Sequence, residues 1–218
     1  MAASFEIRAL LAGKVRPFRA PDEPSAIAKT AVNGVVAIGP LGLAGDEQAD
    51  LSVHGGPDKA IHHYPADHYD FWRQWLGAQP LLDAPGAFGE NVSTQGLVEE
   101  AICLGDRFRL GTALVEVSQG RQPGWKQGHR LGEPRVTARI VETGRTGWYY
   151  RVVEPGSAQA GDRLVPLDRP HPDWPVSRAF RLLIAGHHKD DRAGLAALAD
   201  MPVLAAPWRH RAAQLLAA

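Results

Sequence analysis

The sequence predicts a mainly β protein, in which a closed β core with a few short helices is followed by a small tail of three helices. Short apolar runs separated by turn residues, typical of antiparallel strands, fill most of residues 1–168. Residues 168–176 form a polar, proline-rich linker. After this linker the apolar residues adopt the spacing of helices, so we expect one domain at 1–168 and a second at 169–218.

The first elements follow from alternation and turn residues. Apolar and polar residues alternate from Phe5 to Leu11, which predicts a strand with one buried face. Three prolines in residues 17–26 indicate a connection outside any sheet interior. Asn33-Gly34 predicts a type I′ hairpin turn, because both central residues of such a turn need positive φ. The glycines of residues 39–56 indicate a loop or a barrel corner.

The remaining elements alternate between helix and strand before the helical tail. Pro65 and the spacing of Tyr69, Trp72 and Leu76 predict a helix at 65–76. Beyond it we expect, in chain order, several short strands within 88–119, a short helix near 136–141, strands at 148–153 and 163–167, and tail helices within 179–186, 191–201 and 207–216.

Charge and cysteine content exclude several classes of protein. Lys plus Arg and Asp plus Glu both number 24, so the chain lacks the broad basic field of non-specific nucleic-acid or membrane binding. Any anion must therefore be bound by local placement. A single cysteine, Cys103, and an N-terminus without an apolar leader fit a cytoplasmic protein. No apolar stretch approaches the length of a membrane span.

The first cluster with chemical potential is the stretch from His54 to Pro65. Its paired glycines, Gly55 and Gly56, allow successive N–H groups to converge on an anion beside the charge of Lys59. A tight turn with solvated charges is the plain alternative. A zinc site is disfavoured, because the adjacent His62 and His63 would point to opposite faces of a strand, so we predict no metal site.

The second cluster lies where a strand ends at Ser118 to Lys126. Arg121 and Lys126 suit phosphate or carboxylate recognition, whereas Gly120 and Pro123 also fit an ordinary turn. Two smaller groups accompany it. Glu90 and Asn91 form a possible orienting pair or a satisfied turn, and Arg145 precedes consecutive aromatic residues that belong mainly to the core.

Several strings in one order resemble the YiiM-like branch of the MOSC-domain family. They are GLAGDEQADLSVHGGPDKAIHHYP, FGENVST, ICLGDRFRLG, VSQGRQPGWK and TGRTGWYYRVVEPG. The resemblance implies a MOSC-type β-barrel with a small helical domain after it. It also implies a molybdenum cofactor, a phosphorylated pterin dithiolene, and reduction of N-hydroxylated bases such as 6-hydroxylaminopurine with electrons from a redox partner.

The resemblance assigns the site residues. We expect cofactor binding by a set of eleven residues: His54, Gly55, Gly56, Lys59, His62, Glu90, Asn91, Ser118, Arg121, Lys126 and Arg145. Arg121, Gln122 and position 124 are expected at the catalytic centre.

One departure from the family pattern bears on activity. The resemblance implies a metal-binding cysteine in a QPCWK-like string, but this chain has Gly124 there, which offers no thiolate. Cys103, on an apparent strand, is expected to be a small buried hydrophobe. The alternatives are therefore a reductase, a non-catalytic carrier or sensor of the pterin cofactor, and, less favoured, a His-based metallohydrolase. We expect a small-molecule substrate, and a homodimer is possible.

Overall fold

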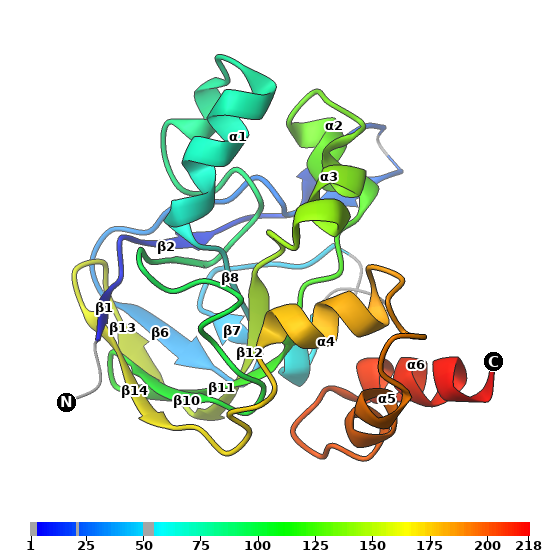
Figure 1. Cartoon of the computed structure of the whole chain (residues 1–218). Helices are drawn as coiled ribbons and strands as arrows, with labels where there is room; N and C mark the ends of the chain where they lie inside the picture. Colours follow the sequence, from blue (N-terminus) through cyan, green and yellow to red (C-terminus); the bar gives the residue numbers. More distant parts are fainter. Residues whose placement is uncertain (1–3, 21, 50–54) are drawn as a thin grey trace.

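A curled nine-stranded sheet forms the centre of the protein in the computed structural model, which describes residues 4–20, 22–49 and 55–218 (Figure 1). Its strands follow the order β1 (Phe5–Glu6), β14 (Arg163–Asp168), β10 (Arg107–Leu110), β11 (Ala113–Gly120), β12 (Trp148–Glu154), β8 (Ile61–His63), β9 (Val92–Ser93), β2 (Ala9–Ala12) and β5 (Thr30–Ala31). Neighbours are antiparallel except β8 and β9, which run parallel. The N-terminal segment takes part near both ends of the sheet, with β1 beside β14 and β2 beside β9, so the sheet curls back on itself.

Two smaller sheets accompany the main one. The first is formed by β13 (Gly156–Ala158), β6 (Val36–Gly39) and β7 (Gly42–Leu43). The second is a ribbon of β3 (Arg16–Pro17) and β4 (Pro24–Ser25), which lies in the proline-rich connection expected from the sequence.

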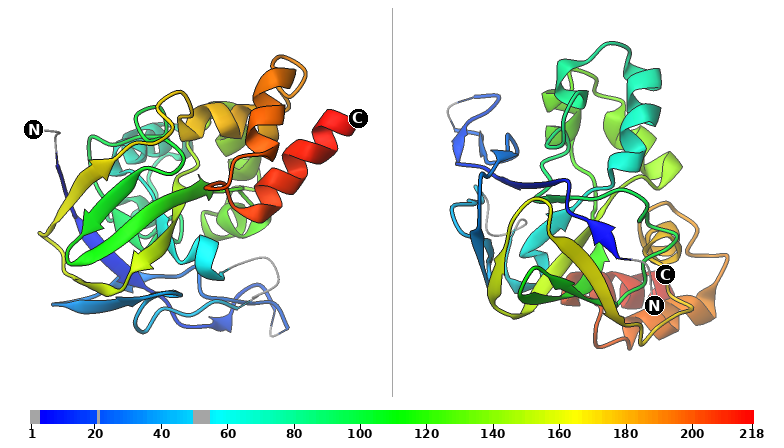
Figure 2. Two further views of the ribbon diagram at one scale, coloured as in Figure 1. Left: turned by 90° about the horizontal axis from the view of Figure 1, so that it is seen from below. Right: turned by 90° about the vertical axis from the view of Figure 1, so that its left-hand side faces the viewer.

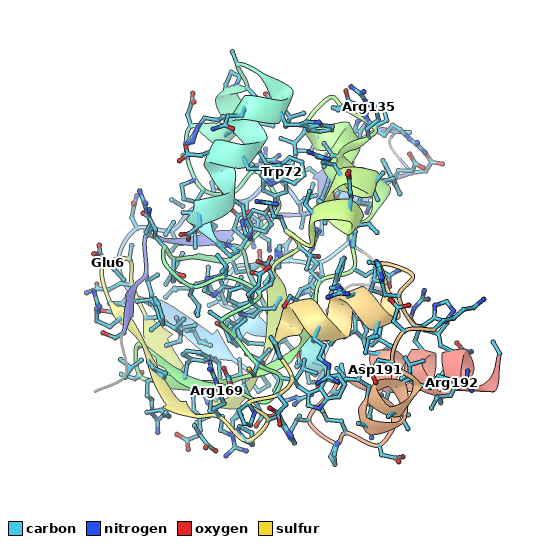
Figure 3. All side chains as sticks on the ribbon, in the orientation of Figure 1. Glu6, Trp72, Arg135, Arg169, Asp191 and Arg192 are labelled. Atoms are coloured by element: carbon cyan, nitrogen blue, oxygen red, sulfur yellow. The ribbon has the colours of Figure 1, made fainter. Side chains whose placement is uncertain are left out.

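The helices pack in two groups. A first group projects from one side of the sheet (Figure 1) and consists of α1 (Tyr69–Leu76), α2 (Trp125–Arg130) and α3 (Val136–Thr143), with the 3₁₀ turns η2 (Ala66–His68) and η3 (Pro80–Leu82) beside α1. Trp72 is fully buried in the aromatic cluster of this group and lies on the inner side of α1 (Figure 3). The cluster anchors the segments that lead into the cleft described below.

The second group is the tail, formed by α4 (Val176–Leu183), α5 (Arg192–Ala199) and α6 (Ala206–Ala217), which pack together at one end of the sheet (Figure 2). One apolar core runs through sheet and tail, because Phe180 and Trp208 belong to the same buried cluster as Val117 and Trp148. The division into 1–168 and 169–218 stays a prediction.

The expected fold class is confirmed in part. The curled sheet is present, but slightly more residues lie in helices than in strands, so the protein is mixed α/β and not mainly β. The helices expected at 65–76 and near 136–141, the strands at 148–153 and 163–167 and the three tail helices are confirmed. No helix within the described residues is both long and apolar enough to cross a membrane.

Three local expectations are wrong. Asn33-Gly34 is no type I′ hairpin, because only Gly34 has a positive φ, of 76°, and β5 and β6 pair with strands of different sheets. Residues 156–158 form strand β13 within the expected turn. The helix α2 begins at Trp125, although the sequence of Ser118 to Lys126 is interpreted as a strand end that opens into a loop. Strand β14 ends at Asp168 and helix α4 begins at Val176, so these elements meet the two ends of the expected linker.

Candidate functional site

Five stretches of chain that are far apart in sequence enclose the main cleft. Its volume is about 810 Å³ including the open mouth. The stretches are the segment from β4 to Ala49, the turn before β8 with β8 itself, the loop before β9, the segment from the end of β11 to the start of α2, and β12 at Tyr149. The lining residues on which the following argument depends are Lys29, Asp46, Gly55, Lys59, His62, Asn91, Arg121, Gln122, Gly124, Trp125, Lys126 and Gln127.

Strand β8 divides its two histidines between the cleft and the core. His63 is fully buried, and its ring nitrogens bond to Tyr150 Oη at 3.0 Å and to Thr94 Oγ1 at 2.9 Å. His62 is 3% exposed and lines the cleft. The opposite placement of adjacent strand residues explains this split. Among the described residues, neither ring nitrogen of His62 has a hydrogen-bond partner of normal geometry.

The electrostatics of His62 favour a neutral ring. Burial lowers its pKa well below the usual value, and the nearby charge of Arg121 lowers it further, which outweighs the opposing effect of the Gly89 backbone. A neutral imidazole offers one donor and one acceptor. His62 can therefore bind a polar ligand without adding charge to the cleft.

Two further buried donors face the cleft from the end of β11 and from α2. Arg121 is 8% exposed and Gln127 1% exposed. In the part of the chain that the structure describes, Arg121 Nη1 and Gln127 Nε2 lack hydrogen-bond partners. Gln127 Oε1 accepts the Gly124 N–H at 3.0 Å, which directs the amide nitrogen elsewhere. Buried polar atoms without partners are costly, so a ligand with acceptor oxygens would satisfy them.

A buried ion pair forms another side of the cleft. The Lys29 ammonium bonds both carboxylate oxygens of Asp46, which also accept the Gly13 N–H and the Asn91 side-chain amide, each at 2.8 Å. Burial lowers the pKa of Lys29, although Asp46 opposes that shift. Since this pair neutralises itself, the positive charge available to an anion comes from Lys59, Arg121 and Lys126.

Gly124 lies at the cleft between Arg121 and the first turn of α2. Its backbone is extended, with φ −139° and ψ 171°. Among the described residues, no heavy atom outside its chain neighbours lies within 4 Å of the place where a Cβ would stand. The position is open, and it could carry a side chain that points into free space.

The fold agrees with solved structures along almost the whole chain. YiiM from Geobacillus stearothermophilus superposes with a TM-score of 0.82 at 32% identity, covering 97% of this chain and 99% of that one. YiiM from Escherichia coli gives a TM-score of 0.81 at 29% identity, covering 99% and 93%. In sequence, Protein YiiM of Escherichia coli K12 is 44% identical over 158 residues, 72% of this chain and 70% of the relative. The MOSC domain model matches residues 50–165.

The chain belongs to the MOSC-domain family.

A fungal relative extends this family comparison. A protein named Reductase from Gibberella moniliformis is 41% identical over 162 residues, which are 74% of this chain but only 29% of the relative. The aligned stretch is thus a minor part of that protein's length.

The main cleft brings together eight of the residues expected from the sequence. They are Gly55, Lys59, His62, Asn91, Arg121, Gln122, Gly124 and Lys126. Gly55 approaches the Gln48 side chain so closely that a Cβ would overlap it, and its φ of +90° also favours glycine. Lys126 donates to the Pro24 carbonyl at 3.0 Å, which ties α2 to β4.

Four other expected residues do not line the main cleft. Glu90 is fully buried and accepts backbone N–H groups of Gly86 and Phe88. Ser118 donates to the carbonyls of Asp58 and Tyr149. Arg145 packs over the Phe71 ring at 4.1 Å, and Gly56 begins the 3₁₀ turn η1 (Pro57–Lys59). His54 lies outside the described residues.

Sequence reasoning missed Lys29, Asp46, Trp125 and Gln127. Lys29 lies in a connection without periodicity, so only its partner in the fold reveals it. Asp46 and Trp125 stand in the quoted strings, and Gln127 directly follows VSQGRQPGWK, but their spacing carried no signal before the fold was known. Within the described residues, no three His, Cys, Asp or Glu side chains are grouped as metal ligands.

Cys103 is buried as expected and does not line the cleft, but it forms an isolated bridge with Pro175 and does not belong to a strand. Its side chain is 3% exposed, and Sγ points to the Pro172 carbonyl at 3.5 Å in the region where the tail begins. Burial raises its thiol pKa. This thiol does not line the cleft.

Proposed function

We propose that the cleft binds the phosphorylated pterin of a molybdenum cofactor and that the protein reduces N-hydroxylated bases, with 6-hydroxylaminopurine as the test substrate. The observation that carries this proposal is a set of buried polar atoms of His62, Arg121 and Gln127 that have no hydrogen-bond partner among the described residues. A phosphate and a pterin ring both present the acceptor atoms that such donors need. Membership of the MOSC family supports the identity of the ligand.

The residues divide between charge and orientation. Arg121 is the natural partner of a phosphate, because its planar fork gives paired, charge-assisted hydrogen bonds. Gln127 and neutral His62 would bond the uncharged edges of the ligand. When bound, the cofactor supplies two-electron oxygen-atom chemistry, while the protein binds and orients it.

The overall reaction needs both electrons and protons. Conversion of R–NHOH to R–NH₂ and water consumes two electrons and two protons, so a reductant must act with this protein. The relative named Reductase, 29% of whose length aligns with this chain, supports the proposal of a redox partner. A cytoplasmic location and a homodimer stay predictions.

The residues present fit the pterin and its phosphate but do not fit a protein thiolate bound to molybdenum. Gly124 has no side chain, and the chain's single cysteine, Cys103, lies outside the cleft. We therefore derive no step through the metal. This observation favours the second candidate function, in which the protein carries or senses the cofactor without catalysis.

One experiment separates the two candidates. The wild-type protein and Gly124→Cys are purified from the same cofactor-producing host, and molybdenum, oxidised pterin fluorescence and 6-hydroxylaminopurine reduction are measured with one electron donor. A reductase needs cofactor and activity in the wild-type protein. Cofactor without activity, followed by activity in Gly124→Cys, would support a carrier. Absence of both pterin and molybdenum from both proteins would contradict the cofactor proposal.

A further inference from the structure

One tight turn contacts both the buried arginine and the buried histidine of the cleft. The Arg121 N–H donates to the Gly147 carbonyl at 3.0 Å, and the Thr146 hydroxyl donates to the Arg121 carbonyl. Both backbone groups of Arg121 are therefore held by residues 146–147.

The same turn contacts His62 through a close approach. Gly147 has a φ of +72°, and a Cβ there would overlap the His63 carbonyl and lie 2.9 Å from His62 Nε2. Only glycine allows this combination of conformation and proximity. A shift of the turn towards β8 would therefore crowd His62, and any shift would move the groups that hold the Arg121 backbone.

A buried carboxylate holds the turn from the other side. Glu99 Oε1 accepts the N–H groups of Thr146 at 2.9 Å and Gly147 at 2.6 Å. Glu99 Oε2 lies 2.7 Å from His68 Nε2, which donates to it. The Glu99 side chain is 1% exposed, and these bonds occupy both of its oxygens inside the protein.

We propose that Glu99 is a positioning residue that sets the geometry of the anion site by fixing the turn at 146–147, an inference that rests on the proposed binding of a phosphate by Arg121. Glu99 does not line the cleft. It acts in two steps. Its carboxylate holds the N–H groups of Thr146 and Gly147, and these two residues in turn hold the Arg121 backbone and set the distance between Gly147 and His62. Preorganised groups of this kind bind ligand without paying for their own ordering.

The test uses inorganic phosphate as the probe and four single variants of the full chain. Arg121→Ala establishes the anion site. Glu99→Ala should weaken phosphate binding about tenfold, and Glu99→Gln should restore most of it because its amide oxygen still accepts the two N–H groups. Thr146→Val removes only the hydroxyl bond to the Arg121 carbonyl and should also weaken binding, which covers the case in which Glu99→Ala does not fold.

The double variant Glu99→Ala with Arg121→Ala distinguishes positioning from general destabilisation. If Glu99 acts through Arg121, the Glu99 effect on affinity should largely disappear when Arg121 is absent. Asp106→Ala is the matched control, because Asp106 is also 1% exposed and accepts a backbone N–H, from Cys103, but does not line the cleft. It should lose stability without loss of phosphate affinity.

Side-chain NMR gives a readout that needs no ligand. The Arg121 Nε–Hε signal and the His62 ring nitrogens should shift in Thr146→Val and Glu99→Ala but not in Asp106→Ala. Unchanged signals and unchanged affinity in the folded Glu99 and Thr146 variants would overturn the inference. Absence of phosphate binding in the wild-type protein, or unchanged binding in Arg121→Ala, would instead contradict the proposed function, and the NMR signals would still decide the role of Glu99.

Discussion

The backbone N–H of Gly124 donates to the side-chain Oε1 of Gln127 at 3.0 Å, so the glycine joins the first turn of α2 through its main chain alone. A side chain at position 124 leaves this bond intact. The φ of −139° is one that any residue adopts, and the space around the Cβ position is open among the described residues.

We therefore predict that Gly124→Cys folds with a change in unfolding free energy below about 0.5 kcal/mol. Its new thiol should react rapidly with a thiol reagent, because it points into the open cleft, whereas the buried Cys103 should react slowly in both proteins. A thiol titration of wild type and variant measures both rates. Slow reaction of the new thiol in Gly124→Cys would show that position 124 is closed in solution.

Arg121 should dominate anion binding. Arg121→Ala should weaken phosphate or pterin binding by roughly 1–3 kcal/mol, the range for loss of a charge-assisted hydrogen bond. Lys59→Ala should have an effect of the same sign. Isothermal titration measures both, with Arg163→Ala on exposed β14 as a charge-matched control. Equal affinities in all three variants would place the anion elsewhere.

Two glycines with nearly equal φ provide a matched test of crowding. Gly147 has a φ of +72°, and a Cβ there would overlap the His63 carbonyl. Gly34 has a φ of +76°, but a Cβ there would have no heavy atom of the described residues within 4 Å, apart from its chain neighbours. Gly34→Ala should cost about 1 kcal/mol of unfolding free energy from backbone strain alone. Gly147→Ala should cost clearly more. Equal losses in urea denaturation would contradict the close packing of the turn.

Acidification should destabilise the protein through its buried histidines. Burial lowers the pKa of His63 from 6.5 to about 3, so between these values the unfolded chain binds a proton that the folded chain does not. The stability that neutral His63 contributes is thus present above pH 6.5 and lost as the pH falls towards 3. The slope should approach about 1 kcal/mol per pH unit for each such histidine. His63→Gln should flatten the slope in urea titrations between pH 7.5 and 5, and an unchanged slope would contradict the assignment.

The shared core predicts that sheet and tail unfold together. Trp208 of α6 is 3% exposed and packs against Gly120 at the end of β11. Trp208→Ala should cost about 3–5 kcal/mol and preserve a single transition. Trp125→Ala, at 43% exposure, should cost much less. Two separate transitions in calorimetry would instead favour independent domains at 1–168 and 169–218.

The sequence predicted the elements whose cause is local. The helix at Tyr69–Leu76 and the strand at Trp148–Glu154 follow from apolar spacing, and the structure confirms both. Asn33-Gly34 failed because strand pairing is decided by distant partners: Thr30–Ala31 pairs with β2 and Val36–Gly39 with β13. No local signal contains that information.

The candidate site was predicted where its residues share one string. Arg121, Gln122, Gly124 and Lys126 stand close in sequence and meet at the cleft. Lys29 and Asp46 are 17 residues apart and become recognisable only when the fold brings them together. Glu90 was misplaced for the opposite reason, because its side chain turns to its own loop while its neighbour Asn91 faces the cleft.

The pairing of β1 with β14 also constrains synthesis of the chain. Phe5 lies opposite Leu164, so β1 has no β14 partner until about 160 further residues have been synthesised. Such long-range pairing is slow to form, and the waiting edge of β1 exposes backbone groups to other chains. We expect a chain truncated before β14 to need a chaperone or to aggregate during translation, whatever the stability of the finished fold.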